Sequence, residues 1–134
     1  MEQVEVLDSE YLFQGRVIIS ETDLKGVITY ANRKFCEISG YTKEELIGQT
    51  HNIIRHPDMP KEVFIKVWNT ISSGQIWHGL IKNLRKDGQY YWVETEVVPS
   101  KDMNGEVIGY VAARKAASRK DVQETSLMYQ KMKA

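Results

Sequence analysis

The spacing of apolar side chains along the chain predicts two strand regions separated by helices. Residues 16–20 and 27–30 are rich in β-branched side chains, which favour strands, and they flank a polar turn at 21–26. Residues 60–73 differ, because their apolar positions recur at helical spacing and form one broad face. The first pattern predicts a β-hairpin, and the second predicts an amphipathic helix.

From residue 77 the apolar pattern alternates with a period of two, which is typical of β-strands. Strands are predicted at 77–84, 89–99 and 106–113. They are joined by Asp87-Gly88 and Asn104-Gly105, two dipeptides that favour tight hairpin turns. Together with the first hairpin, these strands predict a five-stranded antiparallel sheet.

Capping residues place two short helices between the strand regions. Asn32 is a good N-cap for a helix that ends at Gly40. Thr42 and Glu45 have the spacing of a capping box, and Gly48 ends this second helix. The order of elements therefore predicts an α+β fold, with the short helices and one longer helix packed on one face of the sheet.

The chain divides into one domain and two terminal segments. Residues 16–117 contain all the predicted strands and form the domain. Residues 1–15 have a weak helical pattern and are predicted to form an N-terminal cap. Residues 118–134 are predicted to form a C-terminal linker or signalling helix. Its narrow apolar seam suits a coiled coil or a docking helix, and a frayed tail is the alternative.

The composition excludes several classes of partner. The chain has 18 basic and 18 acidic residues, so no broad basic field indicates nucleic-acid binding. No apolar run approaches the roughly 20 residues of a membrane-spanning helix, so direct membrane insertion is not expected. The one cysteine, Cys36, excludes an intrachain disulfide and is predicted to fill space in the core.

The stretch from His51 to Pro60 concentrates ionisable side chains beside two prolines. Arg55, His56 and Asp58 lie close together, and the prolines restrict the backbone around them. A stiff polar stretch between apolar segments resembles the wall of a binding site. The alternative is a capped helix start with an ordinary surface ion pair.

The predicted strand at 77–84 has further binding-site candidates on one face. Trp77 offers a flat ring for stacking, and Asn83 offers both a hydrogen-bond donor and an acceptor. Phe64 and Trp68, on the predicted long helix, would form the opposite wall of an apolar cleft that suits a planar heteroaromatic ligand. The alternative is that both tryptophans belong to the core and that Asn83 caps the following turn.

No standard catalytic or metal-binding motif is present in the sequence. It has no phosphate-binding loop, no glycine-rich dinucleotide motif and no nucleophile elbow. His51, His56 and Asp58 are near one another in sequence, but Pro57 and the irregular local geometry do not suit metal-ligand spacing. We therefore expect a binding module and not an enzyme.

Several motifs resemble those of PAS domains. The opening of that family is matched by Ile28-Thr29-Tyr30-Ala31-Asn32 and by Ser39-Gly40-Tyr41-Thr42-x-x-Glu45-Leu46-Ile47-Gly48. Its closing hairpins are matched by Arg85-Lys86-Asp87-Gly88, Tyr91-Trp92-Val93 and Gly109-Tyr110. The resemblance covers roughly residues 16–117 and implies the PAS fold.

A narrower resemblance is to the PAS domains of aerotaxis and energy-taxis receptors. It rests on His51-Asn52-Ile53-Ile54-Arg55-His56-Pro57-Asp58-Met59-Pro60 and on Gly74-x-x-Trp77-x-Gly79-x-x-Lys82-Asn83-x-Arg85-Lys86-x-Gly88. This resemblance implies a cytoplasmic redox or oxygen sensor that binds FAD non-covalently. It also implies signalling to a HAMP or methyl-accepting chemotaxis domain or to a partner receptor, with any tether to the inner membrane outside this chain. Homodimer formation stays open.

The predicted cofactor site comprises Asn32, Arg55, His56, Asp58, Phe64, Trp68, Trp77 and Asn83. By resemblance, Arg55, His56 and Asp58 match positions important for FAD binding, and Trp77 matches the tryptophan beside the flavin ring. The two asparagines match polar positions of the family's pocket, and the other two aromatic residues supply its apolar wall.

Two alternatives keep the fold and change the function. A PAS domain of this kind would bind heme or a small metabolite if His51, His56 or His78 acted as an anchor. A ligand-free PAS domain would act only as a dimerisation surface.

Overall fold

The computed structural model describes residues 4–133 of the chain. Its elements are β1 (Ile18–Thr22), β2 (Ile28–Ala31), α1 (Arg33–Ser39), α2 (Lys43–Leu46), the 3₁₀ turn η1 (His51–Ile54), α3 (Lys61–Ser72), β3 (Trp77–Leu84), β4 (Tyr90–Lys101), β5 (Val107–Ala116) and α4 (Arg119–Lys133). This order confirms the strands and helices predicted from the apolar pattern and the capping residues.

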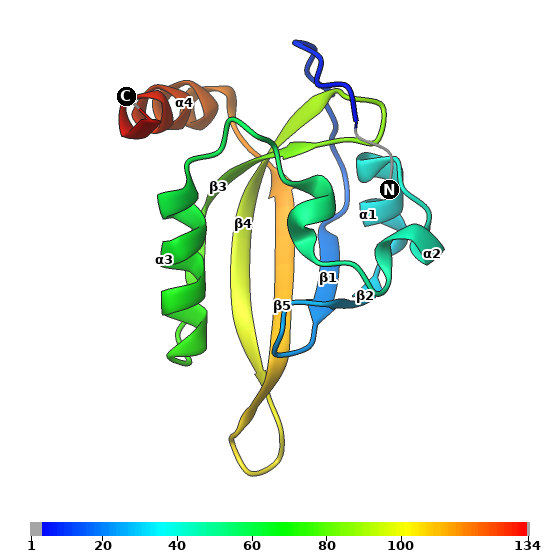
Figure 1. The fold of residues 1–134 in the computed structure, drawn as a ribbon, viewed down its shortest axis with the longest axis vertical. Helices are drawn as coiled ribbons and strands as arrows, with labels where there is room; N and C mark the ends of the chain where they lie inside the picture. The colour runs from blue at the N-terminus through cyan, green and yellow to red at the C-terminus, as the bar shows by residue number, and fades with distance from the viewer. Residues whose placement is uncertain (1–3, 134) are drawn as a thin grey trace.

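The strands form a single antiparallel sheet in the order β2-β1-β5-β4-β3. The predicted α+β fold with a five-stranded antiparallel sheet is confirmed. Helices α1, α2 and α3 and the turn η1 come between β2 and β3 in the chain, and Figure 1 shows α1 and α2 beside β1 and β2, with α3 standing beside β3 and β4. The chain therefore returns to the sheet at β3 only after it has covered one face.

The main core lies between these helices and the sheet. Helical side chains such as Phe35, Ile38 and Leu46 are buried against strand side chains such as Ile18 and Val93. Fully burying a side chain of this size contributes about 1.5–3 kcal/mol. The core on this face therefore holds α1 and α2 rigidly against the sheet.

The predicted caps are present at the starts of the two short helices. The Asn32 side chain accepts a hydrogen bond from the Phe35 N–H, and Thr42 and Glu45 form a complete capping box. Gly40 ends α1 in the left-handed conformation, with φ of 80°, which favours glycine. The local sequence therefore fixes where both helices begin.

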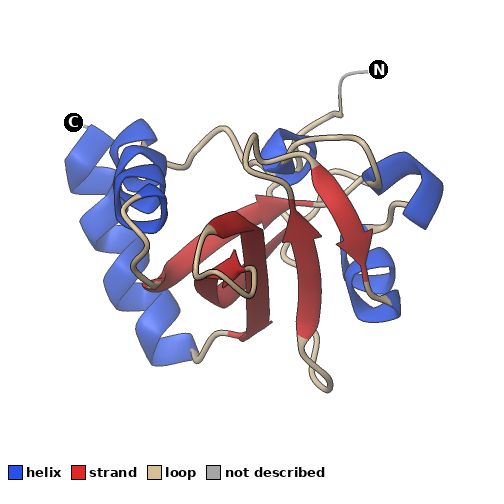
Figure 2. Cartoon of the chain, turned by 90° about the horizontal axis from the view of Figure 1, so that it is seen from below, coloured by secondary structure: helices blue, strands red, loops and turns tan. Residues whose placement is uncertain are grey.

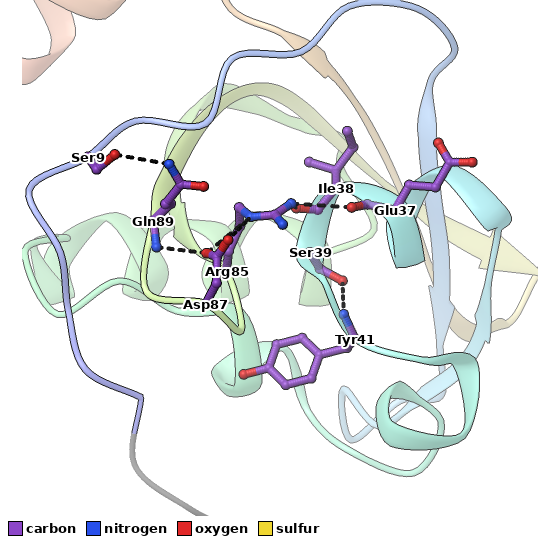
Figure 3. Close-up of polar contacts among 8 residues, drawn as sticks. All are labelled: Ser9, Glu37, Ile38, Ser39, Tyr41, Arg85, Asp87 and Gln89. Carbon is purple, nitrogen blue, oxygen red and sulfur yellow. Dashed lines mark hydrogen bonds and ion pairs between the residues drawn. The ribbon is translucent and has the colours of Figure 1, made fainter.

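A cluster around Arg85 links the turn between β3 and β4 to α1 and to the N-terminal segment (Figure 3). The Arg85 side chain donates to the Ile38 carbonyl oxygen and, at 3.2 Å, to the Asp87 carboxylate. The Asp87 carboxylate also accepts from the Gln89 backbone N–H at 2.9 Å. The Gln89 side chain in turn donates to the Ser9 hydroxyl at 2.9 Å. These contacts hold three segments that are distant in sequence.

Residues 4–15 form no helix, although their apolar side chains have a weak helical spacing. The Leu7 N–H donates to the Gly88 carbonyl at 2.9 Å, and the Tyr11 N–H donates to the Tyr90 carbonyl at 2.7 Å. These bonds to the β3–β4 turn and to the start of β4 hold the segment against the domain as an extended chain. Residues 1–3 of the predicted N-terminal cap lie outside the described residues.

Helix α4 packs against the opposite face of the sheet from Phe35 and the rest of the main core. Its Tyr129 ring stacks on Trp92 of β4 at 6.2 Å, and the Tyr129 hydroxyl donates to the Leu80 carbonyl at 2.6 Å. Figure 2 shows α4 at the same end of the sheet as α3. Of the predicted alternatives for this segment, the structure has the docked helix. No helix within residues 4–133 is long and apolar enough to cross a membrane.

The backbones of β1 and β5 approach each other closely at Gly109. A Cβ atom at this position would lie 2.2 Å from the Thr22 carbonyl oxygen, which is a severe overlap with backbone. We expect Gly109→Ala to lower the free energy of unfolding by about 1–3 kcal/mol, measured by denaturant titration. Ile108→Ala, at an exposed neighbouring position, is the control. Equal losses in the two variants would contradict this close approach.

Candidate cofactor-binding site

A cavity of about 350 Å³ lies between the inner face of the sheet, α3, η1 and the β1–β2 turn. This volume is within the range of small-molecule sites, which is roughly 300–1,000 Å³. Its walls are formed by Thr22, Lys25, Gly26, Thr50, His51, Asn52, Ile54, Arg55, Phe64, Val67, Trp68, Ile71, Ile81, Asn83, Thr95, Val97, Tyr110, Ala112 and Arg114.

The charges on these walls have one sign. Lys25, Arg55 and Arg114 line the cavity, and no aspartate or glutamate does. The whole chain is neutral, with 18 acidic and 18 basic residues, so this local excess of cations is a property of the cavity. A concave site with cations and no carboxylates attracts anionic ligands.

Arg114 of β5 is the deepest of these cations. Arg114 is 5% exposed, and its guanidinium carbon lies 5.0 Å from the centre of the Phe35 ring. The Nη2 atom donates to the Ser20 hydroxyl at 2.9 Å and lies 2.9 Å from Nε2 of His51. The buried Nη1 atom has no hydrogen-bond partner among the described residues. Burial lowers the pKa of this guanidinium to about 10, so it stays charged at neutral pH.

The contact with Arg114 determines the protonation and the tautomer of the His51 imidazole. A guanidinium nitrogen can only donate, so Nε2 of His51 must accept, and the imidazole is neutral with its proton on Nδ1. The Ser20 hydroxyl lies 3.0 Å from the same Nε2 atom. Burial, together with the positive charge of Arg114, lowers the pKa of His51 to about 3. The three side chains therefore form a connected polar group on the cavity wall.

Asn83 of β3 supplies an uncharged polar group on the cavity floor. The residue is 4% exposed, and its backbone forms an isolated antiparallel bridge with Arg55. That bridge ties the end of η1 to the edge of the sheet. Thr95 of β4, also buried, adds a hydroxyl to the same floor. An amide and a hydroxyl in these positions can pair with the polar edge of a planar ligand.

The structure brings four of the predicted site residues to the cavity. They are Arg55, Phe64, Trp68 and Asn83. The Arg55 guanidinium carbon lies 4.1 Å from the centre of the Phe64 ring, which places this cation on the aromatic wall of α3. Among the described residues, the Arg55 side chain has no carboxylate partner.

The other four predicted residues lie outside the residues that line the cavity. Asn32 is engaged as the cap of α1, and its amide also donates to the Val17 carbonyl at 2.9 Å. Trp77 lies on the cavity side of β3, but its ring lies over Gly79, where an added Cβ would be 2.6 Å from the indole. The ring of Trp77 itself therefore takes the space that a side chain at Gly79 would occupy.

His56 and Asp58 are the other two predicted residues outside the cavity, and Asp58 also contacts α4. The buried His56 ring packs edge-on against Tyr90, and its Nδ1 accepts from the Asp58 N–H at 3.0 Å. The Asp58 carboxylate lies 3.3 Å from the Lys82 ammonium and 3.5 Å from that of Lys133, at the end of α4. These contacts connect the stretch from His51 to Pro60 with the sheet and the C-terminal helix.

Ser20, His51, Thr95 and Arg114 were missing from the predicted site. For Arg114, the deepest of these four residues, the sequence did contain a signal: an arginine at an inward-facing position of an otherwise apolar strand. In β5, Tyr110, Ala112 and Arg114 share one face by the two-residue period, and all three line the cavity. No group of three or more histidine, cysteine, aspartate or glutamate residues within residues 4–133 is arranged to hold a metal ion.

Comparison with known proteins identifies the family. The family model described as PAS fold matches residues 28–114, which include most of the sheet and the cavity walls. This chain is a member of the PAS family. The match begins at β2 and ends within β5, so it covers α3, η1 and most of the sheet around the cavity, and the β1–β2 turn lies just before it.

Two curated relatives and one solved structure place this PAS domain more closely. The chain is 42% identical over 123 residues to the aerotaxis receptor of Escherichia coli strain K12, covering 92% of this chain and 24% of the receptor. It is 33% identical over 105 residues to the nitrogen fixation regulatory protein of Klebsiella pneumoniae, covering 78% of this chain and 21% of that protein. The chain thus spans about a quarter or less of these relatives.

The solved structure of the blue-light photoreceptor Aureochrome1 LOV in its light state has the same fold. It superposes with a TM-score of 0.73 over 81% of this chain and 91% of that chain, at 24% identity. At this identity the likeness concerns the fold. The PAS domain described here therefore shares its architecture with LOV domains and its sequence more closely with the aerotaxis receptor.

The low pKa values of His51 and His56 predict a pH-dependent stability. Burial lowers the pKa of His51 to about 3 and that of His56 to about 4, from 6.5. Between about pH 6.5 and pH 4 the unfolded chain binds more protons than the folded chain, so the free energy of unfolding falls as the pH falls. We expect His51→Gln to reduce this slope by up to about 1.4 kcal/mol per pH unit, measured by denaturant titration at a series of pH values.

The exposed neighbour Asn52 provides the control, because Asn52→Ala removes no titratable group. This variant should keep the wild-type slope. An unchanged slope in His51→Gln would mean that this imidazole titrates alike in the folded and unfolded chains, and would contradict its burial beside Arg114.

Proposed function

We propose that this PAS domain is a redox or oxygen sensor that binds FAD non-covalently in the cavity and passes the flavin redox state to a chemotaxis signalling partner. The observation that carries the proposal is a buried guanidinium, on Arg114, that lines an otherwise largely apolar cavity and has no carboxylate partner within residues 4–133. A flavin nucleotide is planar, has a polar ring edge and carries phosphate. It therefore suits both the shape and the charge of this cavity.

The residues present have separate roles in holding such a ligand. Asn83 and Thr95, on the floor, are suited to pair with the polar edge of the ring system. Phe64 and Ile54 supply apolar walls, and Arg55 lies above Phe64 with its donors available for phosphate. When bound, the flavin would supply the redox chemistry, while the protein would supply binding, orientation and exclusion of water.

Arg114 would also affect which form of the ligand binds best. A buried positive charge favours ligands, and ligand states, that carry negative charge nearby. Because Nη1 of Arg114 has no partner in the protein, it is available to donate to such a ligand. A redox change that alters the charge of the ring would therefore change its electrostatic interaction with the group formed by Ser20, His51 and Arg114, while the Asn83 amide would respond to the change at the ring edge.

A short chain of contacts leads from the cavity to the C-terminal helix. Asn83 lines the cavity, and its neighbour Lys82 projects from the opposite face of β3. Lys82 pairs with Asp58, which also pairs with Lys133 of α4. This route supports the proposal that α4 transmits the signal. We further propose that the domain is a cytoplasmic sensor that signals to a HAMP or chemotaxis partner, and the similarity to an aerotaxis receptor supports the chemotaxis role.

The heme alternative has less support from the geometry. Nε2 of His51 already contacts both Ser20 and Arg114, so it is not available as an axial ligand. His56 lies outside the cavity lining, and His78 is exposed and lies 3.1 Å from Glu94. We therefore propose flavin and not heme as the ligand, in a binding role without catalysis.

The identity of the cofactor tests this function directly. We expect the purified protein to be yellow, with an absorbance band near about 450 nm, and to release FAD on denaturation. Chromatography of the released cofactor distinguishes FAD from FMN. A band near about 410 nm would instead indicate heme. A colourless protein that takes up no flavin when mixed with FAD would contradict the proposal.

Transmission from the cavity can be tested at Asn83. We expect Asn83→Ala to retain flavin at least partly, but to uncouple the redox state from the mobility of residues 4–15 and of α4, because the amide makes the redox-dependent contact. Hydrogen exchange of the oxidised and reduced protein measures this mobility. Asn104→Ala, in the exposed β4–β5 turn, is the control. The proposed coupling fails if both variants respond to reduction like the wild type.

A further inference from the structure

One side of the cavity is exposed to solvent. Most of the lining residues are buried or half-buried, but four are exposed: Lys25, Thr50, Asn52 and Trp68. We call these four residues the rim. They come from the β1–β2 turn, from the start of η1 and from α3, which surround the opening together. A ligand that is longer than the cavity must leave it across this rim.

Trp68 is an unusually well-held residue for an exposed aromatic. Its side chain is 43% exposed, yet its ring lies edge-to-face with Tyr110, with a centroid distance of 5.8 Å and an interplanar angle of 87°. On the β1–β2 turn, an added Cβ at Gly26 would lie 3.0 Å from the indole. These two neighbours fix the ring in place, while much of its surface stays open to solvent. A fixed, open aromatic surface is suited to stacking against a flat ring.

Lys25 projects from a turn that is also well ordered. The Asp23 carboxylate accepts from the Lys25 N–H at 2.9 Å and from the Val27 N–H at 3.0 Å, which fixes the backbone on both sides of Gly26. Among the described residues, no ion pair engages the Lys25 ammonium. The rim therefore has a cation and an aromatic ring on adjacent segments and no acidic side chain.

We propose that Lys25 and Trp68 form an outer subsite for the part of a flavin dinucleotide that extends beyond the ring system. In this arrangement, which rests on the proposed function, the Lys25 ammonium pairs with a phosphate and the nucleobase stacks on the open surface of Trp68. The buried group around Arg114 would recognise the flavin, and the rim would distinguish a dinucleotide from a mononucleotide. The chemistry recognised at the rim is thus a phosphate joined to a planar base.

A series of three ligands separates the two subsites. The flavin-free protein is titrated with riboflavin, FMN and FAD, and the dissociation constants are measured by quenching of flavin fluorescence. We expect Trp68→Ala to weaken FAD binding about tenfold and to leave riboflavin and FMN unchanged, because only FAD carries the base. We expect Lys25→Gln to weaken FMN and FAD binding about two- to fivefold and to leave riboflavin unchanged, because riboflavin lacks phosphate.

The matched control is Ile65→Ala, which changes an exposed residue of α3 that does not line the cavity. It should bind all three ligands like the wild type. If the wild type binds none of them, both the proposed function and the outer subsite are wrong. If Trp68→Ala weakens all three ligands equally, flavin binding stands, but Trp68 is a wall of the inner cavity and the outer subsite is overturned. Lys25→Gln, on an exposed turn, gives a second test that does not depend on how the α3 variant folds. If Lys25→Gln changes the affinities for riboflavin, FMN and FAD by the same factor, or leaves all three at their wild-type values, the outer subsite is also overturned.

Discussion

The cavity depends on one constraint, the burial of the Arg114 guanidinium without a carboxylate to pair with it. Removing such a cation from water costs several kcal/mol unless charges or hydrogen bonds compensate. Ser20 and His51 use one of its nitrogens, and the other has no acceptor within the described residues. The protein alone therefore compensates this charge incompletely, and an anionic ligand would complete the compensation.

The fold explains how such a residue stays buried. β5 lies at the centre of the sheet, between β1 and β4, and Arg114 is paired across the sheet with Ile18 and Thr95. Helices and turns inserted between β2 and β3 cover this face, so water reaches the cavity mainly across the rim. The opposite face is available for α4, which is held by Tyr129 and by the ion pair of Lys133 with Asp58. In the proposed function, ligand binding and signal transmission would thus use opposite faces of the same strands.

Most of the fold could be predicted from the sequence, because period-two alternation, tight-turn dipeptides and capping residues are local signals that the packing reinforces. The site could be predicted only in part. Arg55, His56 and Asp58 are near one another in sequence, but in an irregular segment the directions of side chains follow no period. In the structure Arg55 lines the cavity, His56 packs against Tyr90, and Asp58 points outward to Lys82. Arg114 was missed because the last strand was predicted to end one residue before it, and arginines are mostly exposed.

The most direct test of this account compares the stability of wild type and Arg114→Met, each with and without FAD, by denaturant titration. If Arg114 is retained for a ligand, methionine at this position should leave the flavin-free protein at least as stable as the wild type, because Ser20 and His51 still contact each other at 3.0 Å. FAD should then stabilise the wild type clearly and the variant much less. A flavin-free variant that is strongly destabilised, but gains as much from FAD as the wild type does, would contradict the account and make Arg114 a structural residue.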